Sequence, residues 1–238
     1  SPGDAIPSPS TAPPAVPPTS QSTSVLSATP DPGPLSLVLE EAPVRPVRIL
    51  VLGDSTAYAA SYGLAVWANE NPQFVRLDVI WCQGFGVLTE GVATMWDISP
   101  YVVQSREILT NELPDWLARE KPDVVVVMVT VDDAVTRVWD QDEGPLDPQD
   151  SAYRTRLRTA YIALRDQIAS FGVKSIVWVA PPGPTQWGIP EMLQAERWDA
   201  YRSVVRDVAG DPGVDGSTPR SMVAELDALQ AEVDALKR

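Results

Sequence analysis

The residues best suited to chemistry form the tripeptide Gly53–Asp54–Ser55. An apolar run with β-strand character, residues 47–52, leads into the tripeptide, and a helical pattern over residues 56–69 follows it. This order predicts a serine hydroxyl at a helix N-terminus, where free backbone N–H groups and the helix dipole favour a developing negative charge. Ser55 is therefore a candidate nucleophile for acyl transfer. The plainer interpretation is that Asp54 or Ser55 caps the helix that follows.

The chain contains no histidine, so the usual base for a serine nucleophile is missing. In the subtilisin triad, loss of the base histidine costs about 10⁶ in kcat, and a residual acceleration of about 10³–10⁴ over water remains. Asp215 is a candidate replacement, although an ordinary carboxyl with a pKa of about 4 is a weak base for an alcohol at pH 7. We expect catalysis by this chain to be impaired unless a partner chain supplies a base.

Composition narrows the function classes further. The net charge of −14 and the isoelectric point of about 4.3 argue against nucleic acid and anionic membrane surfaces as partners. Cys82 is the only cysteine, which excludes an internal disulfide and a cysteine-based zinc site. With no histidine either, we expect no metal and no other cofactor. The acidic stretch over residues 139–147 lacks the spacing of a calcium-binding EF-hand and is interpreted as a solvated loop.

The chain divides into three parts by composition. Residues 1–44 are rich in Pro, Ser and Thr, and half of the 24 prolines lie within residues 1–46; this predicts a disordered linker. Residues 45–218 form the predicted domain, and residues 219–238 a C-terminal helix. Because the chain starts at Ser1 with a linker of this kind, we interpret it as a piece of a longer protein, tethered downstream of a membrane or export segment.

Strand and helix patterns alternate along the domain and predict a parallel sheet between helices. Residues 123–130 are rich in valine and indicate a buried central strand. Pro122 ends the helix before this strand. The remaining elements are expected as strands over residues 47–52, 77–81 and 175–180, and as helices over residues 56–69, 102–120, 151–171 and 190–209.

The last segment has apolar residues at coiled-coil spacing. Met222, Leu226, Leu229, Val233 and Leu236 recur at intervals of four and three residues. The pattern covers only about two heptads. It predicts either a terminal helix that lies against the sheet or a helix that joins two copies of the chain.

The order of these elements resembles that of the SGNH (GDSL) hydrolase family, and most closely the extracytoplasmic SGNH-like domain attached to acyltransferase-3-type membrane proteins. The likeness covers residues 47–210. It rests on five stretches: Arg48–Ser55, Trp81–Val87, Lys121–Asp123 with Thr130–Asp133, Val177–Gly183, and Arg197–Tyr201.

The resemblance implies a three-layer α/β/α fold with a flavodoxin-like parallel sheet. It also implies a serine esterase or O-acyltransferase that acts on cell-envelope carbohydrate outside the cytoplasm, beside an upstream membrane acyltransferase domain. Ser55 would be the nucleophile and the Gly84 N–H a donor to the oxyanion, while Gly53 and Asp54 would support the turn. The expected partners are a cell-envelope glycan or an acyl ester, and the oligomeric state is left open.

Two positions depart from the family pattern. Asp132 stands where the family has an oxyanion-binding asparagine, and a carboxylate there repels an oxyanion unless it is protonated or turned away. Thr218, in Asp215–Gly216–Ser217–Thr218, occupies the place of the histidine. These departures keep a second function open, that of a non-catalytic domain that binds a glycan or a protein partner.

Tryptophans bear on the binding alternative. Trp96, Trp139 and Trp187 fall in predicted loops, where their rings could stack on sugars or simply pack the loops onto the domain. Trp67, Trp116 and Trp178 fall in predicted helices or a strand and are expected in the core.

Overall fold

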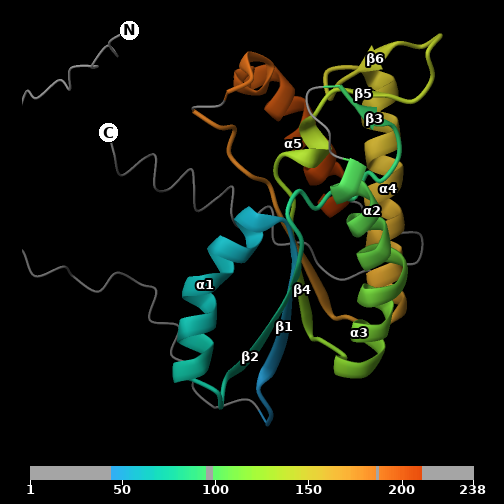
Figure 1. Cartoon of the computed structure of the whole chain (residues 1–238). Coiled ribbons are helices and arrows are strands. Elements are labelled where there is room, and N and C mark those ends of the chain that lie inside the picture. Colours follow the sequence, from blue (N-terminus) through green and yellow to red (C-terminus); the bar gives the residue numbers. More distant parts are fainter. Residues whose placement is uncertain (1–43, 95–98, 186–187, 211–238) are drawn as a thin grey trace, which may run out of the picture. The chain divides into compact units, whose positions relative to one another are not determined.

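The computed structural model describes residues 44–94, 99–185 and 188–210 (Figure 1). The linker predicted over residues 1–44, apart from Val44, and the helix predicted over residues 219–238 lie outside these ranges. None of the helices within these ranges has the length and hydropathy of a membrane span.

A parallel sheet forms the centre of the fold. Its four described strands run in the order β2 (Val75–Trp81), β1 (Val47–Gly53), β4 (Val124–Met128) and β7 (Ser175–Val179), and every neighbouring pair is parallel. Valine and isoleucine dominate these strands because branched side chains pack well on a pleated, buried surface. The sheet confirms the predicted α/β class.

Helices cover both faces of the sheet (Figure 1). Helix α1 (Ser55–Glu70) packs on one face against β1 and β2. On the other face lie α3 (Leu113–Glu120), α4 (Ser151–Ser170) and α5 (Ala195–Gly210), where the Tyr161 ring of α4 lies 5.4 Å from that of Trp178 in β7. This is the predicted three-layer arrangement.

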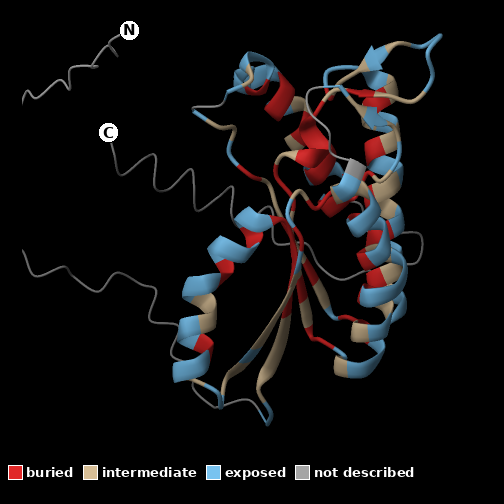
Figure 2. Cartoon of the chain, in the orientation of Figure 1, coloured by how far each residue is buried: buried red, intermediate tan, exposed pale blue. Residues whose placement is uncertain are grey.

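The main core lies between the sheet and α3, α4 and α5 (Figure 2). Burial alternates along β4 and β7, as period-two strands require. The fully or nearly fully buried strand residues of this core are Leu50, Leu52, Val125, Val127, Ile176 and Trp178.

The helical segment before β4 is interrupted at its middle. The sequence predicted one helix over residues 102–120, whereas the chain forms α2 (Ser99–Glu107), a π-helical turn η1 (Ile108–Glu112) and then α3. The N–H of Leu113 donates to the carbonyl of Ile108, five residues back. We attribute the turn to Pro114, which has no N–H to continue the α-helical ladder. Helix α3 ends as predicted, at Lys121 in a left-handed conformation before Pro122.

The helix predicted over residues 190–209 is also divided. A 3₁₀ turn η3 (Pro190–Leu193) precedes α5, which begins at Ala195.

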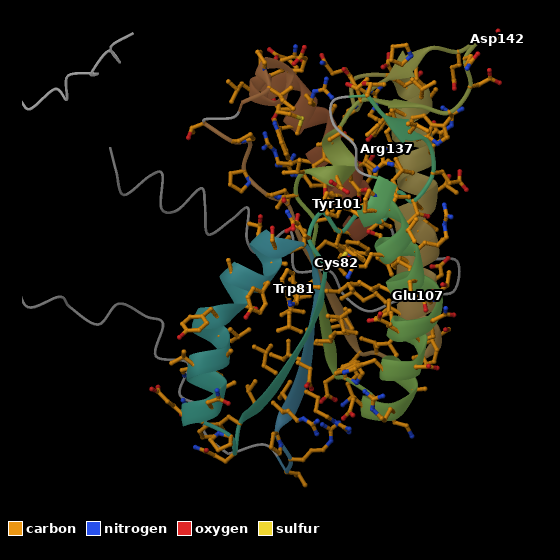
Figure 3. The ribbon with its side chains drawn as sticks, viewed as in Figure 1. Trp81, Cys82, Tyr101, Glu107, Arg137 and Asp142 are labelled. Atoms are coloured by element: carbon orange, nitrogen blue, oxygen red, sulfur yellow. The ribbon has the colours of Figure 1, made fainter. Side chains whose placement is uncertain are left out.

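A small antiparallel sheet was not predicted. It joins β3 (Val92–Ala93), β5 (Arg137–Val138) and β6 (Pro145–Leu146), whose two-residue strands are too short to show a periodic pattern. The predicted acidic loop joins β5 and β6, with Asp142 exposed at its outer end (Figure 3). Among the described residues no group of three or more acidic, histidine or cysteine side chains is arranged to hold a metal ion.

The tryptophan predictions hold only in part. Trp178 is 2% exposed and Trp116 packs against the core, as expected. Trp67 is 42% exposed, so its assignment to the core was wrong. Helix α1 turns its small residues Ala57, Ser61 and Ala68 to the sheet, and these leave its large side chains outside.

Candidate functional site

Gly53 allows β1, β4 and α1 to meet at one point. A Cβ atom on Gly53 would lie 1.9 Å from the Met128 carbonyl oxygen and 2.7 Å from the Ala57 Cβ. Both distances are far inside van der Waals contact, so no other residue fits without a shift of the backbone. The glycine of the tripeptide is thus required by packing.

Asp54 joins the start of α1 to the end of β4. Its Oδ1 accepts hydrogen bonds from the N–H groups of Thr56 at 2.8 Å and Ala57 at 3.2 Å, which makes it the N-cap of α1. Its Oδ2 accepts from the N–H of Thr130 at 2.8 Å and from the Thr130 hydroxyl. A carboxylate offers about four acceptor positions, and these four donors fill them. Asp54 therefore holds the turn, in agreement with the capping interpretation.

Ser55 is the first residue of α1 and is exposed. Among the described residues, no side chain or backbone group forms a hydrogen bond with its hydroxyl. The Asp54 carboxylate takes the next two N–H groups of the helix, so the N–H of Ser55 itself remains at the helix N-terminus. The structure thus presents a serine hydroxyl to solvent at the positive end of a helix, at the carboxyl edge of the parallel sheet.

The glycine-bearing loop after β2 lies very close to neighbouring side chains at two of its glycines. Gly84 has a φ of 62°, and a Cβ there would lie 2.8 Å from the ring of Tyr101. A Cβ on Gly86 would lie 2.8 Å from Oδ1 of Asp133 and 3.2 Å from the Cβ of Asp132. The loop therefore packs directly on the turn that follows β4. Within the described part of the chain, the N–H of Gly84 has no hydrogen-bond acceptor.

Asp133 connects this loop to the turn after β4 and was not assigned a role from the sequence. It is fully buried, and its carboxylate accepts from the N–H groups of Val87 at 2.9 Å and Leu88 at 3.0 Å. The Tyr161 hydroxyl of α4 lies 2.9 Å from its Oδ2. Desolvation raises the pKa of Asp133 above the usual range for a carboxyl.

A chain of phenols extends from Asp133 through the core. The Tyr161 hydroxyl lies 2.8 Å from that of Tyr201 in α5, which donates to the carbonyl of Val129 at 2.9 Å. The Tyr161 hydroxyl donates to Oδ2 of Asp133, so the two phenols link this buried carboxyl to the backbone just after β4. The sequence placed the two tyrosines in two predicted helices, over residues 151–171 and 190–209, but did not indicate that their hydroxyls would be linked.

Asp132 is the buried residue most suited to take part in acid–base chemistry. It begins the 3₁₀ turn η2 (Asp132–Ala134), it is only 3% exposed, and its Oδ2 has no hydrogen-bond partner among the described groups. Desolvation, helped by the charge of Asp133, raises its pKa to about 7. Arg137 acts in the opposite direction. At neutral pH the carboxyl of Asp132 is therefore divided between its acidic and ionised forms.

Two buried arginines hold the turn after β4. The fully buried Arg137 donates to the carbonyls of Asp132 and Glu90, both at 3.0 Å. Arg197 of α5 donates to the carbonyl of Ala134 at 2.9 Å and pairs with Asp147 at 2.9 Å. Because these donors bind backbone carbonyls, they fix the path of the turn that carries Asp132 and Asp133.

Cys82 has no features of a nucleophile. It is 3% exposed, and burial raises the pKa of its thiol to about 11. Figure 3 shows it beside Trp81 at the end of β2. Trp81 lies outside the core: it is 40% exposed and stacks on Tyr58 of α1 with ring centroids 4.5 Å apart.

Some of the predicted site residues lie together at one edge of the sheet. Gly53, Asp54 and Ser55 end β1, Gly84 follows β2, and Asp132 follows β4. Asp215, Thr218, Trp96 and Trp187 lie outside the described residues. Trp139 packs against the core, edge-on to Tyr153 at 5.3 Å.

A cavity of about 520 Å³ lies away from this edge. Arg45, Pro46, Val75 and Arg76 line it at the amino ends of β1 and β2, together with Ala68 from the last turn of α1. It is therefore not the space in front of Ser55.

Comparison of the chain with protein-family models and with curated proteins finds no match.

Replacement of Asp54 by alanine is expected to lower the free energy of unfolding by about 3 kcal/mol or more, because a helix cap is lost and the buried N–H of Thr130 is left unpaired. Urea unfolding followed by circular dichroism measures the change. Asp150→Ala is the matched control. Asp150 precedes α4 in the same position, but its side chain makes no capping bond, so we expect a loss below about 1 kcal/mol. Equal losses in the two variants would contradict the role of Asp54.

The raised pKa of Asp132 predicts a pH dependence of stability. Between about pH 4 and pH 7 the folded protein holds a proton at Asp132 that the unfolded chain releases, so this group favours folding at low pH and loses that contribution as the pH rises through about 7. The full effect is on the order of 4 kcal/mol, since one pKa unit corresponds to about 1.4 kcal/mol. Urea unfolding at several pH values measures it.

Asp132→Asn removes the titrating group. We expect this variant to gain stability relative to the unmodified protein as the pH rises from 5 to 8, whereas Asp142→Asn, at the exposed loop, shows no such gain. A constant difference between Asp132→Asn and the unmodified protein across this range would show that Asp132 titrates normally.

Proposed function

We propose that this chain is an SGNH-type serine esterase or O-acyltransferase domain that acts on cell-envelope carbohydrate outside the cytoplasm, with Ser55 as the acyl acceptor and with impaired turnover. The observation that carries the proposal is the exposed Ser55 at the N-terminus of α1, whose hydroxyl forms no hydrogen bond with the described residues and which the four hydrogen bonds of Asp54 hold in place. The carbohydrate substrate, the extracytoplasmic location and the upstream membrane acyltransferase partner are supported only by the likeness of the sequence blocks.

Each half of the proposed reaction breaks one acyl–oxygen bond and forms another, so that transfer to a sugar gives a new ester and transfer to water gives a free carboxylic acid. The Ser55 oxygen bonds to the acyl carbon, and the alcohol of the substrate leaves with a proton. The acyl group then passes from Ser55 to water or to a sugar hydroxyl, which restores the serine. With no histidine in the chain, the serine proton goes to solvent or to Asp215, which stays a candidate base. Slow turnover is the expected consequence.

Asp132 fits the role of a neutral hydrogen-bond donor to the oxyanion. Its position after β4 is that of the family's asparagine, and an acidic carboxyl kept protonated by burial donates as an amide does. No described residue forms a hydrogen bond with the Oδ2 of Asp132, which supports this role. The concern that a carboxylate would repel the oxyanion thus applies only to the ionised form, which gains population above about pH 7.

A second candidate function is the binding of a glycan without chemistry. The observation that favours it is the exposed stack of Tyr58 and Trp81, which are 49% and 40% exposed. Tyr58 lies one turn after Ser55, and Trp81 ends the neighbouring strand β2. Exposed aromatic rings at this edge offer an apolar surface for the face of a sugar. This candidate needs no activated serine, so the reactivity of Ser55 separates the two.

Labelling by a fluorophosphonate probe is expected on the unmodified protein and not on Ser55→Ala, because the probe reacts with serines that have enhanced nucleophilicity. We expect p-nitrophenyl acetate turnover in the same variant to fall by about tenfold or more, to the level of the uncatalysed background. In-gel fluorescence and absorbance measure the two quantities.

The matched control for this experiment is Ser151→Ala. Ser151 is also exposed, also follows an aspartate and also begins a helix, α4, but it lacks the surroundings of Ser55. Its replacement should change neither labelling nor turnover. If Ser55→Ala and the unmodified protein behave alike, the esterase proposal is wrong and glycan binding by the aromatic stack becomes the favoured function.

The proposed role of Asp132 predicts a pH profile. After subtraction of the rate of Ser55→Ala, kcat/KM for p-nitrophenyl acetate should fall as the pH rises above about 7, because Asp132 loses the proton that it donates. In Asp132→Asn the amide N–H remains a donor, so the fall should disappear while activity at pH 6 is largely kept. If kcat/KM falls with the same midpoint pH in both proteins, the titrating group is not Asp132.

A further inference from the structure

Helix α1 has an outer surface that is unusual for a helix in contact with water. From Ser55 to Asn69 it carries no charged residue, although the whole chain has a net charge of −14. Figure 2 shows most of this helix as exposed. Its large exposed side chains are Tyr58, Tyr62, Val66 and Trp67. Helices at a protein surface normally carry charges on their outer side, so the surface of α1 has the character of an interface.

Two contacts fix which residues lie on which side of α1. Tyr58 stacks on Trp81, so it lies on the flank toward β2. The Thr56 hydroxyl lies 3.4 Å from that of Thr130 after β4, so Thr56 marks the flank toward β4. Helical spacing places three more exposed residues on the β4 flank and two on the outer side. We call these five residues the α1 surface: Ala60, Gly63 and Trp67 on the flank, and Ala59 and Val66 on the outer side.

The sheet beside the β4 flank is only partly covered on the α1 side. Gly53, the register partner of Met128, comes against Ala57 of α1, which places the Met128 side chain on this side. Along β4 and β7 the side chains that share this side are half-buried, whereas those of the opposite face are buried. We call the half-buried set the open face; it consists of Val126, Met128, Val177 and Val179.

The open face is one continuous apolar strip. The register places Val126 beside Val177 and Met128 beside Val179. In the described part of the chain, α1 packs mainly on β1 and β2, and the other helices of the main layers lie on the opposite side of the sheet (Figure 1). Parallel sheets are normally covered on both faces. The strip therefore leaves room for one more helix, directly beside α1.

We propose that two copies of the chain associate here, about a two-fold axis parallel to α1, so that α1 of each copy covers the open face of the other. The outer side of α1, with Ala59 and Val66, then lies on the partner's open face, and the β4 flanks of the two helices meet at the axis. A Cβ on Gly63 would meet no atom within 4 Å, so this flank is low enough for a second helix to approach closely. The contact is isologous, because both copies use the same residues.

The charge of the chain favours a second copy as the occupant. Two molecules with a net charge of −14 repel each other, and they approach most easily where neither carries a charge. The α1 surface and the open face contain no charged residue. A basic partner, in contrast, would be drawn to the acidic parts of the chain. The cores of protein interfaces are depleted in charged residues and enriched in aromatic residues and methionine, which Trp67 and Met128 match.

The size of the surface is near that of a stable interface. Helix α1 has 16 residues, which makes it about 24 Å long and about 10 Å across. It offers two of its sides, and the two strands of the open face, with five residues each, add a strip of about 10 by 17 Å. The flat footprint is roughly 600–700 Å² per copy, and the relief of the side chains adds to it, whereas a stable complex buries about 800 Å² per partner.

The association goes beyond the proposed function and does not depend on it. Ser55 begins α1 one turn before Ala59, at the end of the surface. Tyr58 and Trp81 lie on the other flank. Both candidate sites therefore stay outside the contact.

Gly63→Glu with Val66→Glu tests the contact through the molar mass of the full chain in solution. Both positions are exposed and Gly63 has open space around it, so the double variant should fold normally, which circular dichroism checks. Light scattering after size exclusion should give twice the 25.8 kDa of one chain for the unmodified protein and 25.8 kDa for the variant.

The matched control is Thr155→Glu with Thr159→Glu, which adds the same charges on the exposed side of α4 and should leave the dimer intact. A monomeric unmodified protein would overturn the proposal, since a different occupant, such as a segment of this chain outside the described residues, would then cover α1. A dimer that persists in Gly63→Glu with Val66→Glu would also overturn it, as would dissociation by both double variants.

Disulfide cross-linking between two copies tests the arrangement itself and does not need the charged variant to fold. In a Cys82→Ala background, protein with a cysteine at position 59, 63 or 66 is mixed with protein that carries Val177→Cys, or with protein that carries Thr159→Cys. A disulfide needs Cα atoms within about 7 Å, so at one or more positions we expect the mixed disulfide with Val177→Cys to form at least about tenfold faster. Mass spectrometry identifies the product. Equal rates with both partners would overturn the proposal.

Discussion

The Asp54 carboxylate receives hydrogen bonds from the start of α1, directly after it, and from Thr130, which lies 76 residues further along the chain. One oxygen caps α1 and the other holds the backbone and side chain of Thr130 after β4. Gly53, directly before it, permits the close approach of the two strands that this bond requires. The position of Ser55 follows from these two neighbours. A serine hydroxyl on a freely moving loop could not be presented at a helix N-terminus in this way.

The turn after β4 differs from the Asp54 site, because burial there favours the protonated form of its carboxyl groups. Asp132 and Asp133 are both buried, and desolvation raises the pKa of each carboxyl. Asp133 uses its oxygens to hold the loop after β2 and the Tyr161 hydroxyl, whereas one oxygen of Asp132 has no hydrogen-bond partner in the described part of the chain. Burial of an unsatisfied polar atom costs free energy, so the arrangement at Asp132 is the feature of the structure most in need of a functional reason. Donation to an oxyanion would provide one.

The sequence predicted the elements whose signals are local. The valine strand, the helix end at Lys121–Pro122 and the Gly53–Asp54–Ser55 turn each depend on residues that are close in the chain, and the structure confirms each. The link between Tyr161 and Tyr201 could not be predicted, because it depends on how α4 and α5 pack. Trp67 was assigned to the core because it falls in a predicted helix, but the small residues of α1 face the sheet instead. The two-residue strands of the small sheet carry no periodic signal.

Mass spectrometry of the acyl-enzyme tests the central claim, that Ser55 accepts an acyl group, most directly. The protein would be incubated briefly with p-nitrophenyl acetate, quenched in acid, digested and analysed for acetylated peptides. We predict one acetyl group on the peptide that contains Ser55, absent after hydroxylamine treatment, which cleaves esters. Acetylation confined to lysines, or spread over several exposed serines including Ser151, would contradict a specific nucleophile at Ser55.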